Sequence, residues 1–413
     1  MANLLNVDDA LRAILDRIQA LPAETIPTTQ GLKRVLAEAI TAETDLPPFA
    51  SSSMDGYAVR YSDAAAAHAD QPVQLTVIED IPAGRVAAYP VGPMQAARIM
   101  TGAPLPDGAD AVIPVEETDD EWLADGGAAP PEKVSIYRAA RPGENVRPIG
   151  EDVHHGQMIL QAGTVLRPQD IGMLISLGRA EILVIRQPRV VILSTGDELV
   201  DVGEPLGPGK IYNSNSYVLE GLITMLGGIA IRLPTARDTL DDVRRCLAEA
   251  LAQQPDLIVS SAGVSVGVHD VVRTVVEELG HVELWRVNLR PGKPLAFGQV
   301  QQIPFFGLPG NPVSAMVTFD VFVRPTLLQM SGQPAKSTPP MTAAVVGEAL
   351  RSDGRRSYLR VKLRDENGQL VAYLTGTQSS GALLSMVLAD GLLIVPEGMT
   401  HVPAGTKLPV RVL

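Results

Sequence analysis

The segment DLIVSSAGVSVGVHDVVRTVVEELG, residues 256–280, decides the fold. A short apolar run is followed by a glycine-rich turn and an amphipathic pattern, which predicts a strand, a tight turn and a helix. The same succession recurs in RVVILSTGDELV, residues 189–200, and in PFFGLPGNPVSAMVTFDVFV, residues 304–323. Strands that alternate with helices form a parallel sheet covered by helices. The middle of the chain is therefore predicted to be an α/β domain.

Polar side chains gather where the predicted strands end. Ligands of parallel sheets lie beyond the carboxyl ends of the strands. In this chain those ends carry hydroxyls and carboxylates: Thr195, Asp197, Glu198, Ser260, Ser261, Ser265, Asp270 and Ser314. The sequence thus predicts a binding site at this edge of the sheet.

A cationic segment, WRVNLRPGKPLAFG (residues 285–298), lies between two of these units and contains Arg286, Arg290 and Lys293. The whole chain is acidic, with a formal net charge of -13. Fixed cations in a cleft attract anions locally even when the overall charge repels them. The pattern favours a site for a phosphate or another oxoanion, and a solvated strand edge or a surface ion-pair network is the alternative.

Composition argues against several classes of protein. The acidic balance and an aromatic content of 4% argue against nucleic-acid binding. No apolar run reaches membrane-spanning length and no secretory leader is predicted, so we expect a cytoplasmic protein without membrane contact. The single cysteine, Cys246, excludes disulfides within the chain and lies in a helical pattern that predicts a buried filler role. The six histidines show no pair at zinc-binding spacing.

The flanking regions have other patterns. Residues 6–21 form an amphipathic pattern that predicts a helix, and residues 31–40 predict a second helix after a threonine cap. Short β-like runs broken by Pro and Gly between residues 71 and 137 predict a small β-rich domain. Strict alternation in residues 357–376, with further runs near the C-terminus, predicts a small antiparallel sheet or barrel.

Seven motifs follow one another along the chain: SSSMDGYAV (51–59), RIMTGAPLPDGADAVIPVEE (98–117), NVRPIGEDV (145–153), LSTGDELV (193–200), SAGVSVGVHD (261–270), RPGKP (290–294) and LPGNPVS (308–314). In this order they resemble the molybdopterin molybdenumtransferase (MoeA) family, to which the E domain of gephyrin also belongs. The resemblance implies a homodimer of four-part subunits. Its parts are a helix-containing stalk (1–45 and 140–180), an inserted β-rich domain (46–139), a central α/β domain of the molybdopterin-binding type (181–330) and a C-terminal β-barrel (331–413).

The resemblance also implies an activity. The family inserts molybdate into adenylylated molybdopterin, with magnesium-dependent release of AMP, to give the molybdenum cofactor. The cofactor's own dithiolene sulfurs hold the molybdenum, which is compatible with a single cysteine. Anionic substrates require cations for binding and carboxylates for Mg²⁺. The expected partners are molybdopterin adenylyltransferase and molybdoenzyme chaperones, in transient contacts.

The resemblance assigns a set of cations and hydroxyls to the molybdate and substrate pocket: Arg147, Arg286, Arg290, Lys293, Ser314, Arg360 and Ser380. Such a set suits a tetrahedral oxoanion, because each oxygen gains a charge-assisted donor. From the residues alone, Ser380 is also typical of a turn and Ser314 of a helix cap, and Arg147 favours a structural pair with Asp152. Two positions that are often lysine in the family, 286 and 290, are arginine here, which excludes a neutral amine at either.

A second set of residues is predicted to be catalytic: Asp55, Thr101, Glu198, Asp238 and Asp270. Asp270, Glu198 and Asp238 are the candidate magnesium ligands, and the last two are also expected to position water. From sequence alone Asp55 is also typical of a turn, and Asp238 and Asp270 of helix caps. We expect a cleft shared between subunits, in which Asp55 of one chain faces Asp238 and Asp270 of the other.

Two other functions stay open at this point. The central domain of the family resembles that of molybdopterin adenylyltransferase, which would make adenylyl transfer the reaction. The inserted β-rich domain, the barrel and Asp55 argue against this. A non-catalytic scaffold that clusters receptors, as in gephyrin, is the second alternative, and it would require fused partner domains.

Overall fold

The computed structural model describes residues 4–120, 129–261, 271–333 and 341–413. The chain forms two compact units. The large unit comprises Met1–Glu38, Gly163–Arg167 and Glu181–Leu413, and the small unit comprises Ala39–Ala162 and Pro168–Ala180. Among the described residues, every helix falls short of the length and apolarity that crossing a membrane requires.

The large unit is built on a six-stranded mixed sheet with the order β15-β12-β16-β20-β19-β17. Four neighbouring strands are parallel: β15 (Ile229–Arg232), β12 (Arg189–Leu193), β16 (Leu257–Ser260) and β20 (Ile303–Gly307). The last three were predicted, and β15 adds a fourth. The cationic segment and the residues before it add two antiparallel strands, β17 (Gly280–Arg286) and β19 (Pro294–Val300). The predicted parallel sheet is therefore extended by a hairpin.

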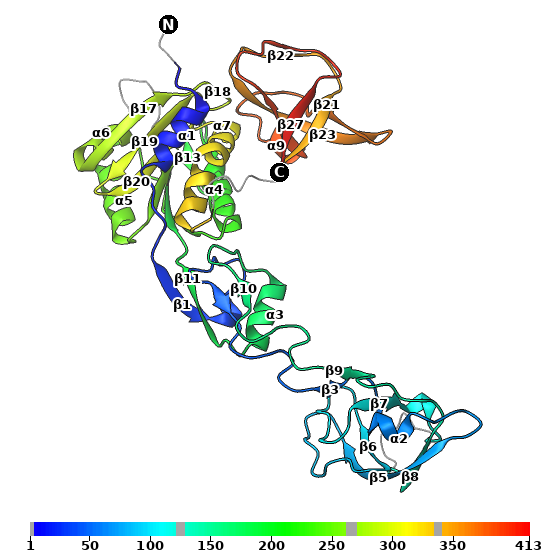
Figure 1. Ribbon diagram of the computed structural model, residues 1–413. Coiled ribbons are helices and arrows are strands. Elements are labelled where there is room, and N and C mark those ends of the chain that lie inside the picture. Colours follow the sequence, from blue (N-terminus) through cyan, green and yellow to red (C-terminus); the bar gives the residue numbers. More distant parts are fainter. Residues whose placement is uncertain (1–3, 121–128, 262–270, 334–340) are drawn as a thin grey trace. The chain divides into compact units, whose positions relative to one another are not determined.

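Helices cover both faces of this sheet (Figure 1). On one face lie α1 (Val7–Leu15), α4 (Ser214–Met225), α7 (Pro312–Thr318), a π-helical segment (Phe319–Val323) and α8 (Arg324–Met330). On the other lie α5 (Leu240–Ala252) and α6 (Val271–Leu279). Successive residues of β12 alternate between the two cores: Val190 packs in the first, and Val191 in the second. Strands covered on both faces are continuously apolar, which explains the sequence pattern.

Cys246 lies in the second core and is buried. Burial raises the pKa of its thiol to about 11. A thiol with this pKa stays protonated at neutral pH and is a poor nucleophile. The predicted role of a buried filler is confirmed.

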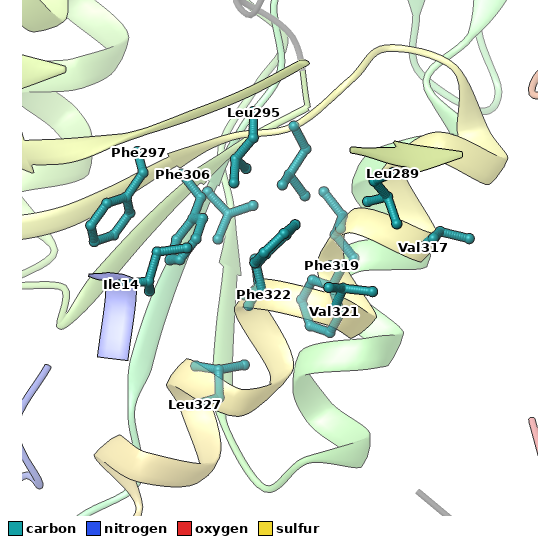
Figure 2. Close-up of a cluster of buried hydrophobic side chains, with 14 of the residues drawn as sticks. Ile14, Leu289, Leu295, Phe297, Phe306, Val317, Phe319, Val321, Phe322 and Leu327 are labelled. Atoms are coloured by element: carbon teal, nitrogen blue, oxygen red, sulfur yellow. The ribbon is translucent and has the colours of Figure 1, made fainter. Parts of the chain in front are cut away.

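The first core contains a tilted aromatic pair, Phe297 and Phe306, with ring centroids 4.9 Å apart (Figure 2). Phe306 has no exposed surface. We expect Phe306→Ala to lower the free energy of unfolding of the large unit by about 3–5 kcal/mol, because it leaves a cavity in a close-packed core. Urea denaturation measures this, with Met225→Ala, at a side chain 77% exposed, as the control. A loss below about 1 kcal/mol would show that the core collapses around the cavity.

The C-terminal part of the large unit is a closed five-stranded barrel. Its strands are β21 (Met341–Val346), β23 (Arg356–Glu366), β24 (Gln369–Leu374), β25 (Gly391–Val395) and β27 (Lys407–Val412). The pairing of β23 with β25 closes it. Asn367 and Gly368 both have positive φ, 57° and 79°, as a two-residue hairpin turn between β23 and β24 requires. The alternation in the sequence predicted this barrel correctly.

The predicted helix over residues 31–40 is wrong. A 3₁₀ turn, Thr28–Gln30, precedes this segment, which then makes a tight turn at Leu32 and Lys33 and two isolated β-bridges. Val35 and Leu36 are buried and form bridges to Val165 and Val184. Pairing with these distant segments of the large unit outweighs the local helical propensity. The preceding strand β1 (Ala23–Pro27) pairs with β11 (Glu181–Ile185) in the same region.

The small unit contains the predicted β-rich domain, a five-stranded sheet with the order β7-β4-β6-β5-β8. Its strands are β4 (Gly56–Val59), β5 (Val73–Ile81), β6 (Gln95–Ile99), β7 (Ala111–Pro114) and β8 (Lys133–Ile136). A Cβ at Gly56 would lie 1.9 Å from the carbonyl oxygen of Ile113, so this strand packing requires glycine. The unit also contains the short pairs β2 (Ile40–Thr41) with β10 (Met158–Leu160) and β3 (Ser51–Ser52) with β9 (Val146–Arg147), and helices α2 (Tyr61–Ala64) and α3 (Pro168–Ser176).

Candidate functional site

Segments that are remote in sequence meet at the N-terminal part of helix α7. The backbone N–H of Val313 donates to the carbonyl oxygen of Ser380, with an N···O distance of 3.0 Å. Ser314 is buried one residue further along α7. The N-cap of this helix is Asn311, so the alternative role of Ser314 as a cap is wrong. The structure therefore brings the two predicted hydroxyl residues, Ser314 and Ser380, onto adjoining segments.

The RPGKP segment passes closely over the same helix. Gly292 has a φ of 107°, and a Cβ on it would lie 2.4 Å from Oγ1 of Thr318. Glycine is required here for both reasons. The short strand β18 (Leu289–Arg290) then pairs with β23 of the barrel. Arg290 is thereby held beside the barrel, and Lys293 follows directly after Gly292.

Arg360 of β23 is the most unusual cation of the site, because its side chain is fully buried at 1% exposure. Its Nε donates to Ser385 Oγ at 3.1 Å, and its Nη2 donates to the carbonyl oxygens of Thr377 and Ser379 at 3.4 and 3.1 Å. Among the described residues it forms no ion pair with a carboxylate. Burial, and then the neighbouring charge of Arg290, lower its pKa to about 10. A buried cation in this environment is stabilised by a bound anion.

Arg290 differs from Arg360 in being partly exposed and in having a carboxylate neighbour. Its Nη1 lies 3.5 Å from Oδ2 of Asp353, and it borders a cavity of about 220 Å³ that Arg351 and Gln378 also line. This contact is long and solvent-accessible, so it stabilises little. The guanidinium of Arg290 is thus available to a ligand in the cavity.

Arg286 and Lys293 lie at the loop end of the β17–β19 hairpin. The N–H of Val287 donates to the carbonyl oxygen of Lys293 at 2.8 Å, and Arg286 is paired with Pro294. Both cationic side chains are exposed. Within the part of the chain that the structure describes, neither side chain makes a hydrogen bond or an ion pair. The surface ion-pair network that the sequence left open therefore does not account for them. The other alternative, a solvated strand edge, agrees with their exposure beside β17, the edge strand of the sheet.

Two predicted carboxylates, Glu198 and Asp238, follow neighbouring parallel strands. The loops that carry them are joined by bonds of 3.4 Å between the backbone N–H of Asp197 and the carboxylate of Asp238, and between the N–H of Asp238 and the carboxylate of Asp197. Helix α5 is capped by Thr239, so the alternative role of Asp238 as a helix cap is wrong. Asp270 lies outside the described residues.

A cavity of about 740 Å³ opens beside these loops. Lys210 and Arg237 line it together with Asp197. Lys210 Nζ donates to the carbonyl oxygen of Asp197. Lys210 and Arg237 were not among the site residues predicted from the sequence, although the motif GKIYNSN at residues 209–215 places Lys210 one residue before a short strand.

Magnesium prefers oxygen ligands and keeps several waters, so one or two carboxylates are enough to bind it beside a phosphate. Glu198 and Asp238 supply carboxylates of this kind at the sheet edge. In the residues that the structure describes, no cluster of three or more metal-ligating side chains is present. The donor set fits an ion held jointly with substrate phosphates, rather than by the protein alone.

In the small unit the structure brings Asp55 and Thr101 together. Oδ1 of Asp55 accepts from the backbone N–H of Thr101 at 2.7 Å and from its hydroxyl at 2.8 Å. Both residues are exposed. The hydroxyl and amide fix one carboxylate oxygen, and no other described residue bonds to the second oxygen. The predicted pair of Arg147 with Asp152 is wrong, since these two described residues form no ion pair, and Arg147 is exposed in β9.

Three family models match consecutive parts of the chain. They are the MoeA N-terminal region (domain I and II) over residues 5–178, the probable molybdopterin binding domain over 191–329 and the MoeA C-terminal region (domain IV) over 343–413.

Similar proteins cover nearly the full length of the chain. The molybdopterin molybdenumtransferase 2 of Mycobacterium tuberculosis (strain ATCC 25618 / H37Rv) is 38% identical over 411 residues, 98% of each chain. The molybdopterin molybdenumtransferase of Haemophilus influenzae is 34% identical over 415 residues, 99% of this chain and 98% of the other. A crystal structure of a molybdopterin biosynthesis MoeA protein from Pyrococcus horikosii is 33% identical, with a TM-score of 0.81 over 99% of each chain.

Proposed function

Because the chain belongs to the MoeA family of molybdopterin molybdenumtransferases and acts in molybdenum cofactor biosynthesis, we propose that it inserts molybdate into adenylylated molybdopterin with magnesium-dependent release of AMP. Molybdopterin and molybdate are substrates of the activity that the relatives' names state. The adenylylated form of the pterin and the metal dependence are the proposed details.

The observation that carries this proposal is the buried guanidinium of Arg360 beside Arg290. Molybdate is a dianion, and it supplies the negative charge that the described residues around Arg360 lack. Lys293 and the hydroxyls of Ser314 and Ser380 lie on segments that adjoin it, so that each oxygen of a tetrahedral ion can receive a charge-assisted or hydroxyl donor.

The second half of the proposed reaction is cleavage of the adenylyl linkage. Asp270, Glu198 and Asp238 would hold Mg²⁺, which neutralises the charge of the phosphates when it is bound. Glu198 and Asp238 also position the attacking water by accepting its hydrogen bonds. Asp55, held by Thr101, is proposed to complete the site.

The purified chain tests the proposal directly. Supplied with adenylylated molybdopterin, molybdate and Mg²⁺, it should consume the adenylylated pterin and release AMP. Consumption of ATP with free molybdopterin would instead identify an adenylyltransferase, and the absence of turnover in both assays would favour a gephyrin-like scaffold.

We expect Lys293→Ala and Ser380→Ala each to raise the molybdate concentration needed for half-maximal turnover at least ~10-fold. Each substitution removes a donor to the oxoanion, and charge-assisted donors contribute about 1.5–3 kcal/mol. Steady-state titration with molybdate measures the change, and Lys407→Ala, at an exposed lysine of β27, is the matched control. An unchanged titration would remove the altered residue from the pocket.

The active form is proposed to be a cytoplasmic homodimer. In this dimer each site combines Asp55 of one subunit with Asp238 and Asp270 of the partner subunit. Transient contacts with molybdopterin adenylyltransferase and with molybdoenzyme chaperones would deliver the substrate and remove the product.

A further inference from the structure

The side chain of Gln378 completes the barrel's hydrogen-bond ladder at Arg360. Strand β24 pairs with β23 as far as Leu374, opposite Val361, and Thr375 then donates its N–H to the carbonyl oxygen of Arg360 at 3.0 Å. At Gly376, φ 100°, the backbone turns away from β23. Among the described residues, no backbone group beyond this turn bonds to the backbone of Arg360.

The amide of Gln378 bonds to both backbone groups of Arg360, in addition to the bond from Thr375. Its Oε1 accepts from the backbone N–H of Arg360 at 2.9 Å, and its Nε2 donates to the carbonyl oxygen of Arg360 at 3.2 Å. One side chain therefore forms the pair of bonds that a neighbouring strand would form. Because it bonds both groups, it fixes the position of the Arg360 backbone and of the loop that carries Gln378.

The same loop is fastened a second time through the side chain of Arg360. The guanidinium donates to the carbonyl oxygens of Thr377 and Ser379, on either side of Gln378. The next residue, Ser380, is bonded to the N-terminus of α7. The amide of Gln378 thus helps to fix the distance between the guanidinium of Arg360 and the hydroxyl of Ser380.

We infer that Gln378 is a positioning residue for oxoanion binding: it holds Arg360 and the Ser380 loop in the arrangement that molybdate requires. This inference rests on the proposed function. Gln378 is neutral, and it lines a cavity with two cations, Arg290 and Arg351, and one carboxylate residue, Glu348. Its neutrality is part of the role, because it leaves the cations in excess. A carboxylate at this position would satisfy the nearby cations and compete with the ligand.

The test compares Gln378→Ala and Gln378→Glu with the unaltered chain, and uses Gln369→Ala, at an exposed glutamine of the same hairpin, as the matched control. Isothermal titration with sodium molybdate alone measures the Kd. Thermal unfolding measures stability, and steady-state kinetics give the KM for each substrate. If Gln378 only supported the fold, the Gln378→Glu variant should resemble the unaltered chain more closely than the Gln378→Ala variant does. The reason is that Glu keeps the acceptor oxygen and the side-chain length.

We expect Gln378→Ala to weaken molybdate binding about 10-fold and Gln378→Glu to weaken it further, while the Glu variant unfolds at a temperature no lower than the Ala variant. The KM for adenylylated molybdopterin should stay within about twofold in both. The inference is overturned if molybdate affinity is unchanged in both variants, or if it is higher in the Glu variant than in the Ala variant. An equal rise in the KM for molybdate and the KM for adenylylated molybdopterin also overturns it. If the unaltered chain itself fails to bind or use molybdate, the proposed function fails as well.

Discussion

An equal mixture of Asp55→Asn and Asp238→Asn chains is expected to regain about a quarter of the wild-type activity, although each variant alone is inactive. With random pairing, half of the dimers are heterodimers. If each site takes Asp55 from one subunit and Asp238 from the other, one site of a heterodimer carries both lesions and the other carries none. One active site in half of the dimers gives the expected quarter.

The experiment has an internal control in Asp238→Asn mixed with Asp270→Asn. These two residues are proposed to come from the same subunit, so every site of that heterodimer keeps one lesion and the mixture should stay inactive. AMP release after subunit exchange, with adenylylated molybdopterin and molybdate supplied, measures both mixtures. If the Asp55 mixture stays as inactive as its components, each site is built within one chain.

Asp270→Asn alone is expected to abolish magnesium-stimulated AMP release. A neutral amide replaces an anionic oxygen ligand, and Mg²⁺ binds such a site far more weakly because it depends on hard charged donors. Titration of AMP release with Mg²⁺ measures the loss. Asp241→Asn is the control, since its carboxylate lies at the start of α5 with a side chain 97% exposed. Persistence of both AMP release and its metal dependence would leave Asp270 as a helix cap.

The architecture could be predicted from sequence where one local signal was sufficient. Continuous apolar runs before glycine-rich turns identified the parallel strands, and alternation around Asn367–Gly368 identified the barrel hairpin. The helix over residues 31–40 could not be excluded, because its propensity is real and is outweighed by pairing with Val165 and Val184. The antiparallel strands β17 and β19 were not predicted, because residues 285–298 were interpreted by their charges as a cationic segment.

The candidate site was predictable in its residues but not in its arrangement. The motifs identified Arg360, Ser314 and Ser380, and the family matches agree with the resemblance that assigned them. No sequence pattern reports that Arg360 is fully buried, since arginine is rarely so without a counter-ion. Gln378 could not be identified from the sequence either, because its bonds to the Arg360 backbone depend on where β24 ends.

The pairing of β1 with β11 limits the order in which the two units can fold during synthesis. The large unit cannot close its N-terminal strand until Ile185 has left the ribosome, and by then the whole small unit has emerged. Domains fold as units during translation, so the small unit is the first part able to reach its native state. The cost of closing so long a loop rises only with the logarithm of its length, so an inserted unit of this size delays the folding of the large unit without greatly destabilising it.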